Sequence, residues 1–356
     1  MHVPGTESIV EKCNMLLKSN TYNVLYRLYP EILKRRTLEY VCRSLPINFG
    51  VEVTNACNAN CSFCGYRFQQ RKTGVMDNLT FRKAIDDYSG IGGGSVSLTP
   101  TVGEPLNDRT LVEKIRYARS KKNITKIWFY TNLISLSHFN VRDLLLSGLS
   151  ILRISTCIKD SEAFKNVFNV DKYKQVISNI VGICEENKKL NYPVKIKLYL
   201  RIPKPFEDTL KGKDYKLVSQ HFNPKDIYIL EDGYDSWGGR IAEENLPFGN
   251  KIYKIDYDIE REPCYELFRR INVLYDGKVN FCVCRDLNAD FEIGNIHQNS
   301  LSEIWKGEKL NYIRDRWFSG VVPEMCQGCQ RYKPVSEFYN KMHKTVVERY
   351  IRNLLY

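Results

Sequence analysis

The apolar and polar positions of this chain follow two alternating periods through most of its first two thirds. Between residues 49 and 232, short runs with strand-like alternation are separated by longer segments with apolar residues at helical spacing. Strands are expected at residues 51–54, 96–100, 126–132, 151–156, 194–202 and 227–230. Helices are expected around residues 78–90, 108–121, 137–147, 171–189 and 208–221. This order predicts an α/β fold with a parallel sheet, whose chemistry belongs at the carboxyl ends of the strands.

The pattern changes towards both ends of the chain. Helical periodicity predicts a helical lead-in at the start and a packing helix at the end. After the parallel sheet, two alternating runs flank Asp276-Gly277, a strong hairpin signal. We therefore expect four regions: a lead-in at 1–48, a β/α region at 49–235, a hairpin-containing region at 236–334 and a helix at 335–356.

Composition and charge restrict the class of protein. The 356 residues are 43% hydrophobic, which is enough for a substantial core. No apolar run approaches the roughly 20 residues of a membrane span, and no secretory signal pattern opens the chain. We expect a cytoplasmic protein whose clustered cysteines bind metal. The 53 Lys and Arg residues are interspersed with 41 acidic ones, so the net charge of +12 does not by itself predict a nucleic-acid partner.

Three cysteines follow the first expected strand within eight residues. Cys57, Cys61 and Cys64 have the spacing C-x3-C-x2-C and fall on the loop after that strand. A structural zinc site is usually closed by four ligands, whereas iron-sulfur clusters are held by thiolates. The motif predicts an iron-sulfur cluster with one position open to a ligand from outside the protein. A zinc loop, or three unrelated core cysteines, is the alternative.

This spacing, with aromatic Phe63 before the third cysteine, resembles the signature of the radical S-adenosylmethionine (radical SAM) enzymes. The resemblance implies a partial (β/α)6 TIM-type barrel and a 4Fe-4S cluster that binds S-adenosylmethionine. In that family, an electron from the cluster cleaves the cofactor to a 5'-deoxyadenosyl radical, which abstracts a substrate hydrogen. The resemblance also implies a reductant of the flavodoxin or ferredoxin type.

The resemblance assigns cofactor-binding residues to the ends of the strands. Gly103 and Glu104 match the family's Gly-Gly-Glu-Pro segment, which binds the methionine amino group, although Val102 replaces its first glycine. Phe63 belongs to the same candidate set. The remaining candidates, at the ends of the third, fourth and fifth strands, are Thr131, Asn132, Ser155 and Arg201.

Cys157 is a candidate catalytic residue on the fourth strand. Alternation places Arg153, Ser155 and Cys157 on one face. A thiol near a substrate radical can donate a hydrogen atom and so complete an epimerisation. A packed core cysteine is the alternative interpretation. Arg153, Lys197 and Tyr199 are the candidates for a substrate base.

A second cysteine set lies in the last third of the chain. Four thiolates from three loops suit zinc or an iron-sulfur cluster, and the spacing leaves both open. The order of cysteines around the hairpin resembles the SPASM or twitch domain of radical SAM oxidoreductases, which implies one auxiliary 4Fe-4S cluster. Its expected ligands are Cys264, Cys282, Cys326 and Cys329. Cys284 lies on the same strand face as Cys282, and can replace it or serve as a catalytic thiol.

An auxiliary cluster that accepts or relays an electron favours net oxidation. We therefore expect a radical SAM oxidoreductase that dehydrogenates or epimerises a hydroxylated carbohydrate or aminocyclitol. A peptide-maturing enzyme, which forms a crosslink or epimerises a residue, is the alternative, and an RNA-modifying enzyme is a further one. From another class, a zinc-stabilised interaction protein would be colourless. The sequence leaves open the substrate, its base and the oligomeric state.

Overall fold

The computed structural model describes residues 42–43, 45–99, 101–230, 233–254, 262–282 and 286–337. Most of the expected lead-in at 1–48 and most of the expected helix at 335–356 lie outside these ranges, as does Cys284. None of the helices in the described ranges combines the length and apolarity needed to span a bilayer.

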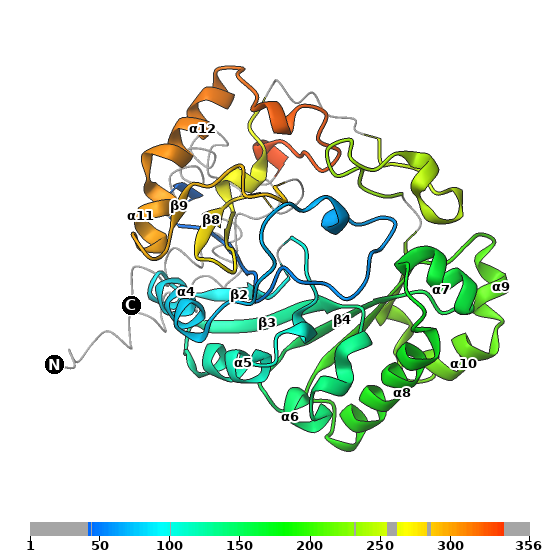
Figure 1. Ribbon diagram of the computed structural model, residues 1–356. Coiled ribbons are helices and arrows are strands. Elements are labelled where there is room, and N and C mark those ends of the chain that lie inside the picture. Colours follow the sequence, from blue (N-terminus) through cyan, green and yellow to red (C-terminus); the bar gives the residue numbers. More distant parts are fainter. Residues whose placement is uncertain are drawn as a thin grey trace, which may run out of the picture.

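Six parallel strands form the first part of a curved sheet, as the alternation predicted (Figure 1). The strands are β1 (Asn48–Val51), β2 (Gly94–Ser97), β3 (Ile124–Thr131), β4 (Ile151–Thr156), β5 (Lys195–Leu200) and β6 (Ile227–Ile229). The helices between them are α4 (Asn78–Gly90), α5 (Leu111–Ser120), α6 (Val141–Leu145), α7 (Ser161–Phe168), α8 (Tyr173–Lys189), α9 (Phe206–Leu210) and α10 (Lys213–Ser219). The α/β partial-barrel prediction is confirmed.

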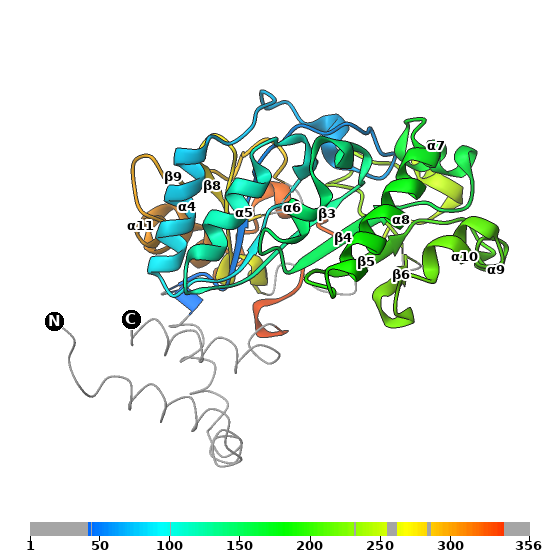
Figure 2. The ribbon, with the colours of Figure 1, turned by 90° about the horizontal axis from the view of Figure 1, so that it is seen from below.

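The helices α4, α5, α6 and α8 cover one face of this sheet, and alternation along each strand explains why (Figures 1 and 2). On β4, Leu152 and Ile154 are fully buried. Arg153 and Ser155, which alternate with them, are partly exposed on the opposite face. On β1, Phe49 stacks on Tyr88 of α4 with ring centres 4.2 Å apart. The apolar side chains thus seal the helical layer, and the polar ones line the inner face of the barrel.

Helix α7 was not expected from the sequence. Its signals are present: Asp160 accepts a hydrogen bond from the Ala163 amide as N-cap, and Phe164, Val167 and Phe168 form a buried stripe. Figure 2 shows α7 at the same edge of the sheet as the segment that follows β1. This position makes α7 part of the candidate site.

The predicted hairpin is present, and it continues the same sheet. β7 (Arg270–Val273) pairs in parallel with β1, and β8 (Lys278–Asn280) and β9 (Gly294–Asn295) follow in antiparallel order. The nine strands run β6-β5-β4-β3-β2-β1-β7-β8-β9, and helices α11 (Leu301–Lys306) and α12 (Glu308–Phe318) come after them. The expected division at residue 235 is therefore not a boundary of the sheet.

Candidate active site

The loop after β1 carries the C-x3-C-x2-C motif at one side of a pocket of about 330 Å³. Cys57, Cys61 and Cys64 all line this pocket. The loop is closed at its base, where the Met76 amide donates to the Val53 carbonyl at 2.8 Å. The three thiols thus project from one anchored loop into one cavity.

Helix α7 supports the middle of this cysteine loop. The Ser62 amide donates to the Val167 carbonyl at 3.0 Å, and the Asn60 amide donates to the Phe168 carbonyl at 3.2 Å. The last carbonyls of a helix have no partner within it, so the loop satisfies them. The Phe168 ring also meets Phe63 edge-on, with centres 6.1 Å apart. The sequence signal that could have revealed this support was the α7 pattern itself.

The thiols fit a cluster better than a single metal ion. Among the described residues, no group of three His, Cys, Asp or Glu side chains is arranged to hold one ion. In an iron-sulfur cluster the thiolates bind different irons, so they surround a cavity instead of meeting at one point. Burial raises the pKa of Cys57 to about 12, with Glu104 and Cys64 adding to the rise. Cluster loading must therefore release thiol protons.

Glu104 lies opposite the cysteine loop and is almost fully buried. Its carboxylate accepts hydrogen bonds from the Thr131 hydroxyl at 2.7 Å, the Asn132 amide at 2.7 Å and the Leu106 amide at 3.1 Å. Burial raises its pKa to about 7, against the lowering effect of these donors. A fixed buried carboxylate beside a cavity is suited to bind a cationic group such as an ammonium.

Asn132 positions the cysteine loop by means of its side chain. Its amide donates to Asn58 Oδ1 at 2.7 Å, and the Asn58 amide donates to the Ser135 hydroxyl at 2.7 Å. Ser135 in turn donates to Asn107 Oδ1 at 2.8 Å. These contacts join the cysteine loop to the loops after β2 and β3. Asn58 was not among the residues singled out from the sequence, because its partner is 74 positions away.

Arg201 closes the far side of the pocket. Its guanidinium carbon lies 3.6 Å from the centre of the Phe63 ring, and its Nε donates to the Ser155 hydroxyl at 3.3 Å. Its positive charge lowers the pKa of the Cys61 thiol, although burial has the larger, opposite effect. Ser155, Phe63 and Arg201 thus form one wall, and all three had been singled out from the sequence.

Cys157 does not line this pocket. Its side chain is fully buried in the main apolar core, and burial raises its pKa to about 12. This placement favours the packing interpretation over a role as hydrogen-atom donor.

The turn-rich segment after β6 covers the cysteine loop. The Trp237 indole donates to the Phe63 carbonyl at 3.0 Å, and its ring lies against Gly65 so closely that a Cβ there would be 2.6 Å from the ring. The Tyr234 ring of the same segment packs against Phe63, with ring centres 5.5 Å apart. Gly65 is therefore needed for the close contact between the two segments.

The second cysteine set converges at the other end of the chain. The backbone of Cys264 bridges to Pro334, and the Cys329 amide donates to the Cys326 carbonyl at 3.1 Å. Burial raises the pKa of Cys264 well above its usual range, and the nearby Glu266, Cys329 and Cys282 add to this rise. The structure thus gathers Cys264, Cys282 and the Cys326–Cys329 turn. Cys284 lies outside the described residues.

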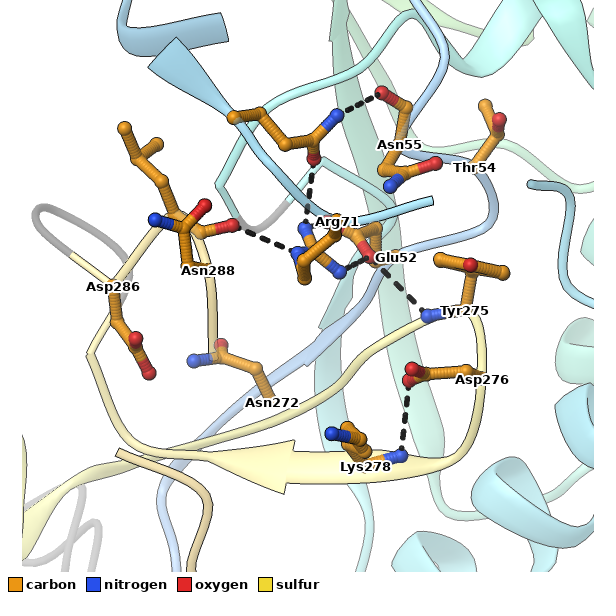
Figure 3. Close-up of polar contacts among 12 residues, drawn as sticks. Glu52, Thr54, Asn55, Arg71, Asn272, Tyr275, Asp276, Lys278, Asp286 and Asn288 are labelled. Carbon is orange, nitrogen blue, oxygen red and sulfur yellow. Dashed lines mark hydrogen bonds and ion pairs between the residues drawn. The ribbon is translucent and has the colours of Figure 1, made fainter. Parts of the chain in front are cut away.

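A buried ion pair connects the cysteine loop to the hairpin region (Figure 3). Arg71 donates to both carboxylate oxygens of Glu52, at 2.7 and 2.6 Å, and its Nε donates to the Leu287 carbonyl at 2.7 Å. Glu52 also accepts from the Tyr275 amide at 3.2 Å. One guanidinium therefore holds the return of the cysteine loop, β1 and the segment after Cys282 together.

Two family models match the chain at the two cysteine sets. The radical SAM superfamily model matches residues 51–180, and the SPASM model, an iron-sulfur cluster-binding domain, matches residues 264–330. The chain thus contains a radical SAM domain and a SPASM domain. The radical SAM domain implies S-adenosylmethionine and a 4Fe-4S cluster. The SPASM domain implies additional, auxiliary iron-sulfur clusters.

Similar proteins include enzymes with different substrates. The chain is 23% identical over 320 residues to PqqA peptide cyclase of Gluconobacter oxydans, which covers 81% of this chain and 84% of the relative. The crystal structure of SuiB from Streptococcus suis superposes with a TM-score of 0.55 at 16% identity, covering 91% of this chain and 81% of SuiB. BtrN in complex with AdoMet and 2-DOIA has a TM-score of 0.50 at 18% identity, with coverages of 78% and 88%. Both structural likenesses support the radical SAM fold.

Replacing Gly103 by alanine should weaken binding of S-adenosylmethionine by a factor of about 5 to 150. Gly103 has φ +104°, and an added Cβ would lie 2.2 Å from the Thr54 carbonyl oxygen. Strain of this kind costs about 1–3 kcal/mol, and each ~1.4 kcal/mol is a factor of ten in affinity. Equilibrium dialysis on the anaerobic holoenzyme measures this affinity. Gly90→Ala, at a helical glycine with no atom within 4 Å of the added Cβ, should leave it unchanged.

Proposed function

We propose that this radical SAM enzyme abstracts a substrate hydrogen for a dehydrogenation or an epimerisation, in which the Cys57–Cys64 loop holds the cluster that binds S-adenosylmethionine and the second cysteine set holds one cluster that accepts or relays an electron. The observation that carries the proposal is that the structure gathers each cysteine set, one on the loop after β1 and the other around the β7–β8 hairpin of the same sheet. When bound, the cofactor and its cluster would supply a 5'-deoxyadenosyl radical that abstracts a substrate hydrogen. A flavodoxin- or ferredoxin-type protein is the proposed reductant.

The residues of the pocket have separate tasks in this proposal. Glu104, fixed by three hydrogen bonds, would bind the cofactor's ammonium group. Arg201 and Ser155, on the opposite wall, would bind its carboxylate or ribose hydroxyls. Phe63 and Phe168 would exclude water from the same side, because both rings line the pocket. Asn132 would act indirectly, since its side-chain amide is already engaged by the cysteine loop.

The auxiliary site would hold its cluster with Cys264, Cys282, Cys326 and Cys329, and Cys284 is the proposed substitute for Cys282. We also propose that the four regions expected from the sequence differ in function, with S-adenosylmethionine bound by region 49–235 and the auxiliary cluster held by region 236–334. The first two cysteines of this set precede and follow the β7–β8 hairpin, and the hairpin pairs with β1. Cys264 and Cys282 thus lie towards the amino end of β1, and the cysteine loop follows its carboxyl end.

A small hydroxylated molecule is the first candidate substrate, to be dehydrogenated or epimerised. The likeness in fold to BtrN, whose structure contains AdoMet and 2-DOIA, supports it. A peptide is the second candidate, and the likeness to PqqA peptide cyclase over 81% of the chain supports it. A peptide substrate would be crosslinked or epimerised.

Reduction of the reconstituted holoenzyme with dithionite in the presence of S-adenosylmethionine should yield 5'-deoxyadenosine and methionine. Chromatography measures both products, and their absence would overturn the proposal. Aminocyclitols and peptides encoded beside the gene are then tested as substrates by mass spectrometry. Loss of two hydrogens indicates dehydrogenation or crosslinking, whereas deuterium uptake without other mass change indicates epimerisation.

A further inference from the structure

The inner face of the barrel carries two cations on adjacent strands, beside the pocket. Parallel register aligns Tyr130 of β3 with Arg153 of β4, and Arg153 with Lys197 of β5. Arg153 lies two residues before Ser155 on the same strand, so both side chains are on the face that lines the pocket. Like charges at neighbouring strand positions destabilise a sheet. Their presence here calls for a negative group nearby.

Lys197 has an acidic side chain nearby, whereas Arg153 has none among the described residues. The Lys197 ammonium donates to the Tyr228 hydroxyl at 2.7 Å and lies 4.0 Å from an Asp226 oxygen. Arg153 donates one hydrogen bond, from Nη1 to the Tyr130 hydroxyl at 3.0 Å. Its Nε is buried without a hydrogen-bond partner, and no acidic side chain in the described part of the chain forms an ion pair with it.

Aromatic rings hold the Arg153 guanidinium in place. Its central carbon lies 4.1 Å from the centre of the Trp128 ring and 5.1 Å from that of Tyr130. The Tyr199 ring continues this wall, 5.3 Å from Tyr130 and stacked on Tyr228 at 4.7 Å. The planar Arg153 guanidinium is thus held against an aromatic surface, and only its Nη1 donates a hydrogen bond to a described residue.

Arg119 shows what a structural arginine looks like in the same fold. Its Nε donates to the Gly148 carbonyl at 2.9 Å, its Nη1 to the Ile124 carbonyl at 3.2 Å and its Nη2 to the Ser150 hydroxyl at 2.6 Å. All three nitrogens join separate segments of the chain. Arg153 makes one such contact, so the fold alone does not account for its charge.

We propose that Arg153 is a specificity-determining residue that binds a carboxylate of the substrate. Nη1 is taken by Tyr130, which leaves the edge formed by Nε and Nη2. Two parallel donors on one edge of a guanidinium match the two oxygens of a carboxylate. The inference rests on the proposed function, because it places the substrate beside the pocket assigned to S-adenosylmethionine. It narrows either candidate substrate to one that carries a carboxylate.

The first test separates a binding role from a structural one. In Arg153→Met, the apparent unfolding midpoint of the anaerobic holoenzyme should stay equal or rise, because a partly buried cation without an ionic partner is removed with little loss of side-chain volume. Arg119→Met is the matched control and should lower the midpoint by several degrees, since it leaves backbone carbonyls without donors. A fall in Arg153→Met as large as in Arg119→Met would show that Arg153 is structural.

The second test uses acetate as the probe. Acetate is titrated into the holoenzyme while sodium chloride keeps the ionic strength constant, which removes general screening effects. The wild-type midpoint should rise by about 2 °C or more near saturation, by linkage. Arg153→Met should show no rise, and Arg153→Lys a reduced one, because a lysine lacks the planar edge. Absence of the wild-type rise would overturn the proposal.

Phosphate at the same ionic strength distinguishes a carboxylate site from a general anion site. A smaller shift with phosphate than with acetate supports the proposal, and an equal or larger one contradicts it. Formation of 5'-deoxyadenosine is followed separately in all variants. Absence of 5'-deoxyadenosine from the wild type would refute the proposed function, whereas absence of the acetate shift from a wild type that still forms 5'-deoxyadenosine would refute only the carboxylate site.

Discussion

Alanine at Cys57, Cys61 and Cys64 together will abolish formation of 5'-deoxyadenosine and reduce bound iron from about eight to about four atoms per chain, as expected for two all-thiolate clusters. The three thiols line the pocket that also contains Glu104 and Arg201, so the variant lacks the ligands of the cluster proposed beside the cofactor site. Iron and sulfide analysis with electron paramagnetic resonance measures the change.

Two further variants serve as controls for this prediction. A Cys264/Cys326/Cys329→Ala variant should lose the other four irons or so, following the same assignment, and still cleave S-adenosylmethionine. Cys184→Ala, at a buried position in the middle of α8, should keep all the iron. If the first triple variant retained its full iron, the assignment of the cysteine loop would be wrong. Zinc in place of half of the iron would remove the electron acceptor and with it the case for oxidation.

Arg71→Met will lower the free energy of unfolding by about 3–5 kcal/mol, the usual cost of removing one partner from a buried ion pair. The side chains of Glu52 and Arg71 are 0% and 8% exposed, so the remaining carboxylate would be buried without its partner. The Leu287 carbonyl would lose its donor as well. Urea denaturation of the anaerobic protein, followed by fluorescence and circular dichroism, measures the loss.

A double variant and a surface variant test the reason for this loss. Arg71→Met/Glu52→Gln should recover part of the stability, because no buried charge then remains. Arg116→Met removes an ion pair with Asp143 in which both side chains are more than half exposed, and it should change stability by about 1 kcal/mol or less. An Arg71 variant that lost no more than the Arg116 variant would show that the network of Figure 3 is not a structural link.

Local signals in the sequence were sufficient for much of the fold. The fourth strand has the bounds that its alternation predicted, Ile151–Thr156, because its two faces differ so clearly in polarity. The first strand was expected at residues 51–54 and lies at Asn48–Val51. After Val51 the chain turns to its own return segment, where Thr54 forms a bridge with Val75 and its hydroxyl donates to Gly74. Alternation alone does not reveal such a change of pairing partner.

The candidate site could be predicted where its chemistry is local. The three cysteines and Gly103-Glu104 stand in short motifs, and the structure places all five on one pocket. Contacts between distant segments could not be predicted from the sequence. The amide of Asn132 looked available for a cofactor, yet it is engaged by Asn58, and the support from Val167 depends on how α7 is placed. Such roles follow from tertiary packing, which one sequence does not display.

The parallel pairing of β1 with β7 also determines how this protein can be divided. Without residues 236–356, β1 would have no neighbour on that side, and its backbone N–H and C=O groups would form an open sheet edge. An exposed flat edge is a template for pairing with other chains. The radical SAM portion is therefore a poor candidate for truncation or for exchange between homologues as a separate module, since its first strand is completed by the domain that would be cut away.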